Sequence, residues 1–149
     1  MKLTDNFTLE EFTFSQTATR KGINNEPSDK VKANLQVLAQ GLERVRAILL
    51  CPIHISSGYR SPALNRAIGG SSKSAHMDGY AADFTSPRFG TPNDIVRTLK
   101  RHGIKCDQCI YEGGINGGWV HISFAPAMRN QFMTATFNNG VATYSEYKE

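Results

Sequence analysis

The chain has 149 residues, of which 40% are hydrophobic and 20% charged, a balance typical of a globular domain and unlike that of a disordered chain. Its formal net charge of +4 is spread without runs of like charge, so it fits plain solubility as well as attraction to an anionic surface. No segment approaches the roughly 18 apolar residues of a membrane helix, and basic and aromatic residues are not interleaved, so neither membrane insertion nor nucleic-acid binding is expected.

The amino-terminal third of the sequence predicts helices. Thr8 is a plausible cap for a short helix, with Glu11 as its capping-box partner. The strongest helix signal covers residues 27–50, with Ser28 as its cap. Apolar residues recur there at alternating spacings of four and three: Val31, Leu35, Leu38, Leu42, Val45 and Leu49. We assign this stripe to the core and give it no chemical role.

The middle of the sequence predicts two strands separated by a short helix. Residues 53–57 alternate and are rich in β-forming types, which indicates a strand. Ser61 and Pro62 open a short helix that two glycines end at residues 69–70. A turn then leads into a second strand over residues 80–85.

The rest of the chain predicts one more helix followed by hairpins. The helix covers residues 91–103, with Pro92 in its first turn. Strands over 106–112 and 119–124 flank "GGINGG", which is typical of a β-hairpin, and the tail predicts another hairpin turning at 138–140. Helices followed by hairpin-linked strands indicate a single α+β domain, residues 1–149, with an antiparallel sheet.

Three cysteines, Cys51, Cys106 and Cys109, cannot form a closed disulfide framework. The C-x-x-C spacing of Cys106 and Cys109 is also found in redox and metal sites. No second pair completes a zinc knuckle, and the surrounding "KCDQCIYE" has the pattern of a strand. We therefore interpret these residues as reduced, half-buried thiols.

The stretch "SAHMDGYAAD" carries the clearest chemical pattern. His76 and Asp83 are both competent zinc ligands, and the small residues between them leave room for their side chains to converge. A catalytic zinc site usually has about three protein ligands and an open position for water, so a third ligand is expected downstream.

His121, in the strand-like "WVHISF", is the best candidate for that ligand. His102 falls in the exposed last turn of a predicted helix, where a cation complements the helix dipole, so it is not expected to bind metal. His54 flanks a predicted core strand and remains a weaker alternative. On spacing alone, a satisfied core histidine and a turn-capping Asp83 also explain the pattern.

The motif also carries a family resemblance. Ser74, His76, Gly79, Ala81 and Asp83 fit the pattern S-x-H-x-x-G-x-A-x-D. Together with the later W-V-H strand and the upstream "SSGYRSPALN", this resembles the zinc D-alanyl-D-alanine carboxypeptidase family, which includes L-alanyl-D-glutamate endopeptidases and phage endolysins. The resemblance implies a hedgehog/DD-peptidase fold.

Residue roles follow from that resemblance. It implies that His76, Asp83 and His121 hold one zinc ion. It also implies that Arg60 faces the substrate, holding a carboxylate or the polarised carbonyl oxygen, and that Ser74 orients the site or contacts the substrate. A surface ion pair for Arg60 and a turn hydroxyl for Ser74 are the structural alternatives.

The chain departs from the family pattern at the general base. Family members commonly carry Glu or Asp three residues before the last histidine, where this chain has Gly118. If "GGINGG" turns symmetrically about residues 115–116, Glu112 lies opposite Trp119 and on the same face as the ligands. We favour Glu112 as the base, although a solvated hairpin carboxylate is the alternative and a one-residue slip would reverse its face. Asp78 and Asp107 are weaker candidates.

The resemblance therefore implies a zinc peptidase that hydrolyses peptidoglycan stem peptides, as an endolysin does. Since "MKLTDNFTLEEF" lacks the apolar region of a signal peptide, we expect synthesis in a host cytoplasm and action on the wall after release. A monomer is expected. The alternative is a wall-binding or phage structural module that keeps the fold and metal but lacks a base, for which Gly118 is the argument.

Overall fold

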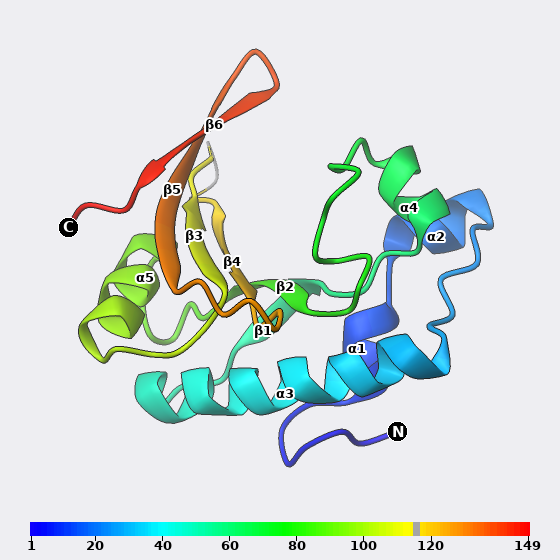
Figure 1. The fold of residues 1–149 in the computed structure, drawn as a ribbon, viewed down its shortest axis with the longest axis horizontal. Coiled ribbons are helices and arrows are strands. Elements are labelled where there is room, and N and C mark those ends of the chain that lie inside the picture. The colour runs from blue at the N-terminus through cyan, green and yellow to red at the C-terminus, as the bar shows by residue number, and fades with distance from the viewer. Residues whose placement is uncertain (115–116) are drawn as a thin grey trace.

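The computed structural model describes residues 1–114 and 117–149. Within them the chain forms five helices and six strands (Figure 1). The helices are α1 (Leu9–Thr13), α2 (Gln16–Lys21), α3 (Asp29–Leu49), α4 (Pro62–Ala67) and α5 (Pro92–Arg101). The strands are β1 (His54–Ser57), β2 (Ala81–Thr85), β3 (Gln108–Glu112), β4 (Trp119–Ser123), β5 (Gln131–Asn138) and β6 (Val141–Glu146).

Helix caps explain where the helices begin. The predicted capping box of Thr8 and Glu11 is present in α1, and the Ser28 side chain caps α3 by accepting from the N–H of Val31. Ser61 caps α4 in the same way. Helix α2 was not predicted. Ser15 caps its start and Gly22, in the left-handed conformation, ends it, and both residue types are helix-boundary signals that the sequence contains.

The sheet has the strand order β1-β2-β4-β3-β5-β6. It is mixed, so the prediction of an antiparallel sheet is wrong at one pairing: β3 and β5 run parallel, while the other neighbours are antiparallel. The reason is that the chain leaves β4 beside the start of β3 and crosses over to begin β5 at that same end, with Gln131 paired to Gln108. Both predicted hairpins are confirmed.

Asp107 holds this crossover in place. Its buried carboxylate accepts hydrogen bonds from the backbone N–H and the guanidinium of Arg129, at 2.8 to 3.0 Å. Its carbonyl accepts from the N–H of Gln131 at 2.9 Å. The carboxylate is committed to these donors, so Asp107 is not available as a general base.

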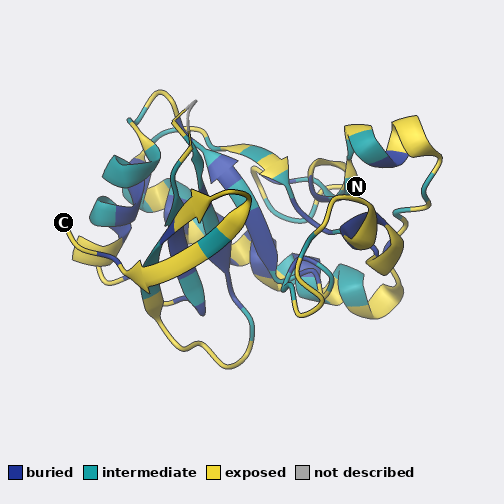
Figure 2. Cartoon of the chain, turned by 90° about the horizontal axis from the view of Figure 1, so that it is seen from above, coloured by how far each residue is buried: buried dark blue, intermediate teal, exposed yellow. Residues whose placement is uncertain are grey.

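Helices α3 and α5 cover one face of the sheet. The core combines the predicted stripe of α3, including Leu35, Leu38 and Leu42, with Phe84 and Val120 from the strands. Figure 2 shows buried segments, in dark blue, in the central strands of the sheet. The fully buried Cys106 and Cys109 belong to this core, so they are more deeply buried than the half-buried thiols that were predicted. The opposite face, which carries Asp83 and His121, has no helix packed on it in the part of the chain that the structure describes.

No helix in residues 1–114 or 117–149 combines the length and apolar character needed to cross a membrane.

Candidate metal centre

Strands β2 and β4 place two of the candidate ligands side by side. Asp83 and His121 are directly paired in the antiparallel ladder, and paired residues project from the same face of a sheet. His76 reaches this point from the turn that precedes β2. The seven-residue spacing in "SAHMDGYAAD" therefore spans one turn and the first residues of a strand.

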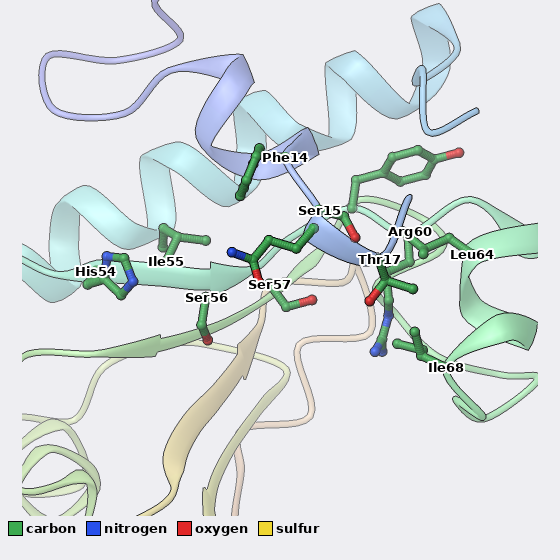
Figure 3. Close-up of a pocket in the computed structure, with 12 residues that line it drawn as sticks. Phe14, Ser15, Thr17, His54, Ile55, Ser56, Ser57, Arg60, Leu64 and Ile68 are labelled. Carbon is green, nitrogen blue, oxygen red and sulfur yellow. The ribbon is translucent and has the colours of Figure 1, made fainter. Parts of the chain in front are cut away.

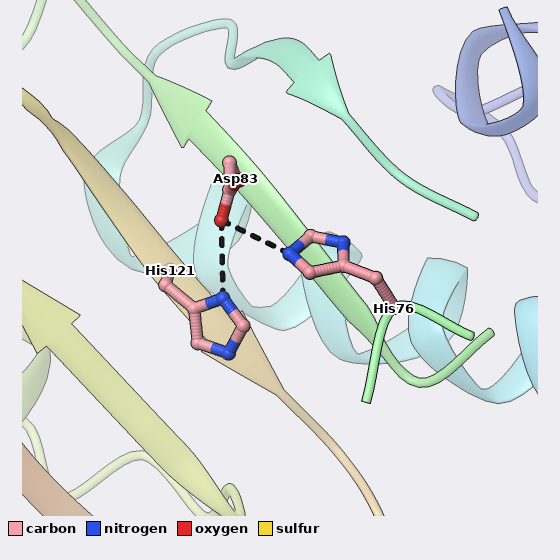
Figure 4. Close-up of side chains that lie close together, drawn as sticks. All are labelled: His76, Asp83 and His121. Atoms are coloured by element: carbon pink, nitrogen blue, oxygen red, sulfur yellow. Dashed lines mark hydrogen bonds and ion pairs between the residues drawn. The ribbon is translucent and has the colours of Figure 1, made fainter. Parts of the chain in front are cut away.

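The three side chains converge on one point (Figure 4). Their possible ligand atoms all lie within 4.8 Å of one another. The Oδ1 atom of Asp83 is 3.3 Å from Nε2 of His76 and 3.0 Å from Nδ1 of His121. Two imidazole nitrogens and one carboxylate oxygen make a donor set that suits zinc.

A backbone hydrogen bond fixes the orientation of His76. Its Nδ1 lies 2.7 Å from the carbonyl oxygen of Gly58, which can only accept, so Nδ1 carries the proton. The lone pair is then on Nε2, the nitrogen that faces Asp83. This is the arrangement in which an imidazole is held ready for a metal.

Burial and mutual charge shift the pKa values of the three groups. Burial lowers the pKa of His76, against the opposing effect of Asp83. Burial alone would raise the pKa of Asp83, but His76 and His121 hold it well below its usual range. Burial opposes the charged form of His121, yet the hydrogen bond to Asp83 raises its pKa above the ordinary value. Asp83 is therefore ionised at neutral pH, as a metal ligand must be.

The cluster is closed on one side and open on the other. The side chain of His76 is 2% exposed, whereas those of His121 and Asp83 are 14% and 15% exposed. Three donors with an accessible side leave room for water or substrate, which distinguishes a catalytic arrangement from a closed structural one.

Arg60 and Ser74 lie next to this cluster. The Nη2 group of Arg60 donates to Oγ of Ser74 at 3.1 Å, and the same oxygen accepts from the N–H of His76 at 3.2 Å. The Nε group of Arg60 is buried and has no hydrogen-bond partner among the described residues. Burial lowers the pKa of Arg60, while the carboxylates of Asp83 and Glu112 act in the opposite direction.

Glu112 lies on the ligand face, as the predicted hairpin register requires. It is paired with Trp119, which confirms that register, although the predicted turn at residues 115–116 lies outside the described part. The indole Nε1 of Trp119 donates to Oε2 of Glu112 at 2.8 Å. Burial and then the charge of Asp83 raise the pKa of Glu112, which brings this carboxyl closer to the working range of a general base.

Position 118 cannot accommodate the acidic residue that the family pattern places there. Its φ is +74°, a left-handed conformation that side chains disfavour. A Cβ atom built at this position would also overlap the carbonyl oxygen of Glu112. The backbone of this hairpin therefore needs glycine at 118.

The remaining candidates lie outside the cluster. His54 is exposed on β1, and Nδ1 of His102 is 3.0 Å from the carbonyl oxygen of Thr98 at the end of α5. Asp78 is exposed, and Asp107 belongs to the crossover described above.

A groove runs along the free side of the edge strand β1. Its volume is about 520 Å³, and His54, Ser57 and Arg60 are among the residues that line it. Figure 3 shows His54 at one end of the groove and Arg60 near Ile68 at the other. Arg60 thus borders both the groove and the metal cluster. Sequence reasoning missed this groove because helices α2 and α4 close it from distant parts of the chain.

Comparison with known proteins gives one family. The family model described as Peptidase M15 matches residues 5–123, which include the whole cluster, Arg60, Ser74 and Glu112. A search of curated proteins finds no match.

Proposed function

Because the chain belongs to the peptidase M15 family, we propose that it is a zinc-dependent peptidase that hydrolyses amide bonds in peptidoglycan stem peptides. The observation that carries this proposal is the convergence of His76, Asp83 and His121 within 4.8 Å on an open face of the sheet. The α+β architecture is consistent with the hedgehog/DD-peptidase fold, and we propose that the chain adopts this fold.

The chemistry of the donors fits one zinc ion. His76 would bind through Nε2, since its Nδ1 is engaged by Gly58, and His121 through Nδ1, the nitrogen that faces Asp83. When bound, zinc supplies Lewis acidity toward a water molecule and toward the substrate carbonyl group.

Glu112 handles the proton in this scheme. It removes a proton from the attacking water as the water oxygen bonds to the amide carbon, and it returns that proton to the amine nitrogen as the C–N bond breaks. Its raised pKa supports both steps, and the indole N–H of Trp119 fixes the direction of its carboxylate.

Arg60 faces the negative charge that develops on the carbonyl oxygen, or a carboxylate of the substrate. The support is its unpartnered, buried Nε group and its position between the groove and the metal cluster. Ser74 holds the other end of the guanidinium through the bond to Nη2.

The biological setting is part of the proposal. We propose an endolysin-like monomer that is made in a host cytoplasm and reaches the wall after a separate protein permeabilises the membrane. The modest positive charge suits an anionic wall.

Digestion of purified peptidoglycan by the zinc-loaded protein tests the function. Mass spectrometry of the released muropeptides identifies the bond and shows whether cleavage is internal or terminal. We expect new termini that chelator treatment and Asp83→Asn abolish. Wall binding without any released fragment would overturn the peptidase proposal and favour the non-catalytic module, for which the lack of an acid at Gly118 is the argument.

A further inference from the structure

Three aromatic rings extend the ligand face beyond Glu112. Trp119 belongs to β4, Phe137 to β5 and Tyr144 to β6, and we call them the aromatic patch. The rings of Trp119 and Phe137 pack with centroids 6.4 Å apart. Phe137 is 44% exposed and Tyr144 is 52% exposed, so burial in the core does not account for them.

Strand pairing puts this patch on the same face as the metal cluster. Trp119 pairs with Glu112, Glu112 with Ala135, and Ala135 with Tyr144. Directly paired residues share a face, and Phe137 lies two positions after Ala135 on the same strand. The row from Trp119 to Tyr144 therefore crosses the sheet on the side that carries the candidate ligands.

Ala135 lies in the middle of this row, paired with Glu112 on one side and with Tyr144 on the other. It is fully buried, although no described helix packs on this face of the sheet. Trp119 joins the patch to the candidate catalytic groups, because its indole contacts both Glu112 and the ring of Phe137. Burial raises the pKa of Tyr144, and the carboxylates of Glu112 and Asp83 raise it further.

The hairpin that carries two of these rings lies outside the family match. The match ends at residue 123, and β5 and β6 cover Gln131–Asn138 and Val141–Glu146. Figure 1 shows the hairpin projecting beyond the other strands of the sheet, and Figure 2 shows it largely exposed.

We propose that the aromatic patch is a substrate subsite that binds an uncharged, apolar part of the peptide next to the scissile bond. The patch adjoins Glu112 through the indole of Trp119, so a peptide lying over the cluster continues directly onto these rings. Partly exposed aromatic rings offer large apolar area at low entropic cost to such a ligand. This inference rests on the proposed peptidase function, since the occupant is the substrate itself.

Trp119 makes the subsite measurable, because it is the only tryptophan in the sequence. The probes are the synthetic stem pentapeptide L-Ala-γ-D-Glu-L-Lys-D-Ala-D-Ala and its two terminal dipeptides. Binding is followed by tryptophan fluorescence in a zinc-loaded Glu112→Gln background, and hydrolysis is followed in the parent protein. We expect Phe137→Ala and Tyr144→Ala each to weaken pentapeptide binding about five- to tenfold, mainly as a higher KM, with the dipeptides unaffected.

Val141→Ala is the matched control. Val141 is 65% exposed on the same hairpin, but it pairs with Asn138 and so projects from the other face. It should leave both binding and hydrolysis unchanged. Melting temperatures of all variants show whether the hairpin is intact.

The outcomes separate this inference from the proposed function. Cleavage with parent-like Kd and KM in both ring variants overturns the subsite and leaves the peptidase standing. Pentapeptide binding that the ring variants weaken, without any cleavage by the parent protein, overturns the peptidase and keeps the patch as a peptide-binding surface. Dimerisation that Phe137→Ala abolishes, measured by sedimentation, would assign the patch to a self-contact and overturn the subsite.

Discussion

At the scale of single residues, Trp119 links the chemistry of Glu112 to the packing of the sheet. Its indole donates to the Glu112 carboxylate on one side and packs against Phe137 on the other. A hydrogen bond to the ionised form of a carboxyl group favours that form. Trp119 is therefore a positioning residue that also moderates the pKa of the proposed base.

Trp119→Phe tests this role through the pH profile. The variant keeps an aromatic ring but removes the N–H group whose bond lowers the pKa of Glu112. A base works only when deprotonated, so the acidic limb of kcat/KM should move to higher pH. Steady-state rates between pH 4 and 8 measure the shift, with Val141→Ala as the control. An acidic limb at the parent position, even with a lower maximum, would contradict the positioning role.

The metal cluster makes a second residue-scale prediction. Asp83→Asn keeps the size of the side chain but removes the charge that both histidines face. We expect zinc affinity to fall by at least about 100-fold, because even the outer hydrogen-bond partners of metal ligands contribute 10- to 100-fold. Zinc content after dialysis, measured by elemental analysis, checks this. His54→Ala should retain the metal, and equal zinc content in both variants would show that Asp83 is no ligand.

At the scale of elements, the hairpin of β3 and β4 depends on Gly118. A side chain at position 118 would destabilise the hairpin in two ways: it would strain the left-handed backbone, and its Cβ would overlap the carbonyl oxygen of Glu112. Gly118→Ala should lower the free energy of unfolding by more than about 2 kcal/mol, from strain and overlap together. Gly103→Ala is the matched control, since Gly103 has a φ of +68° and open space at its Cβ position. Urea unfolding measures both variants. Equal decreases in their free energies of unfolding would show that the overlap with Glu112 contributes nothing.

The crossover into β5 depends on Asp107, and its contribution to stability depends on pH. Arg129 holds the pKa of Asp107 below its ordinary value, so the stabilisation is present above the unfolded pKa and is lost as pH falls through the folded one. Asp107→Asn should lower the free energy of unfolding at pH 7 by about 1 to 3 kcal/mol.

Unfolding experiments at pH 7 and at pH 3 check this expectation. The difference in the free energy of unfolding between Asp107→Asn and the parent protein should be smaller at the lower pH. Asp5→Asn, at a carboxylate whose side chain is 98% exposed, should change stability little at either pH. A difference that is the same at both pH values would show that the negative charge of Asp107 does not contribute to stability.

At the scale of the whole molecule, sequence patterns within a few residues of one another predicted more of the structure than relations between distant segments did. Caps such as Ser28 and the register of Glu112 opposite Trp119 depend on residues a few positions apart, and both agree with the structure. The parallel pairing of β3 with β5 depends on a crossover that a neighbouring carboxylate stabilises, and no periodicity encodes it. The candidate ligands could be identified from a motif, whereas the position of Tyr144 in the same cross-strand row as Glu112 depends on the pairing of three strands.

The metal centre should also stabilise the whole fold, because its donors come from distant parts of the chain. His76, Asp83 and His121 meet only when β2 and β4 are paired, so an ion held by all three binds the folded state and not the unfolded one. Free zinc at about 1,000 times its Kd then adds about 4 kcal/mol, which corresponds to a rise in melting temperature of roughly 10 °C. Calorimetry with added zinc and with chelator measures the rise. At the same zinc concentration Asp83→Asn, whose affinity is at least about 100-fold lower, should gain at most about a third of this free energy. A parent protein that melts at the same temperature with zinc and with chelator would contradict a shared metal site.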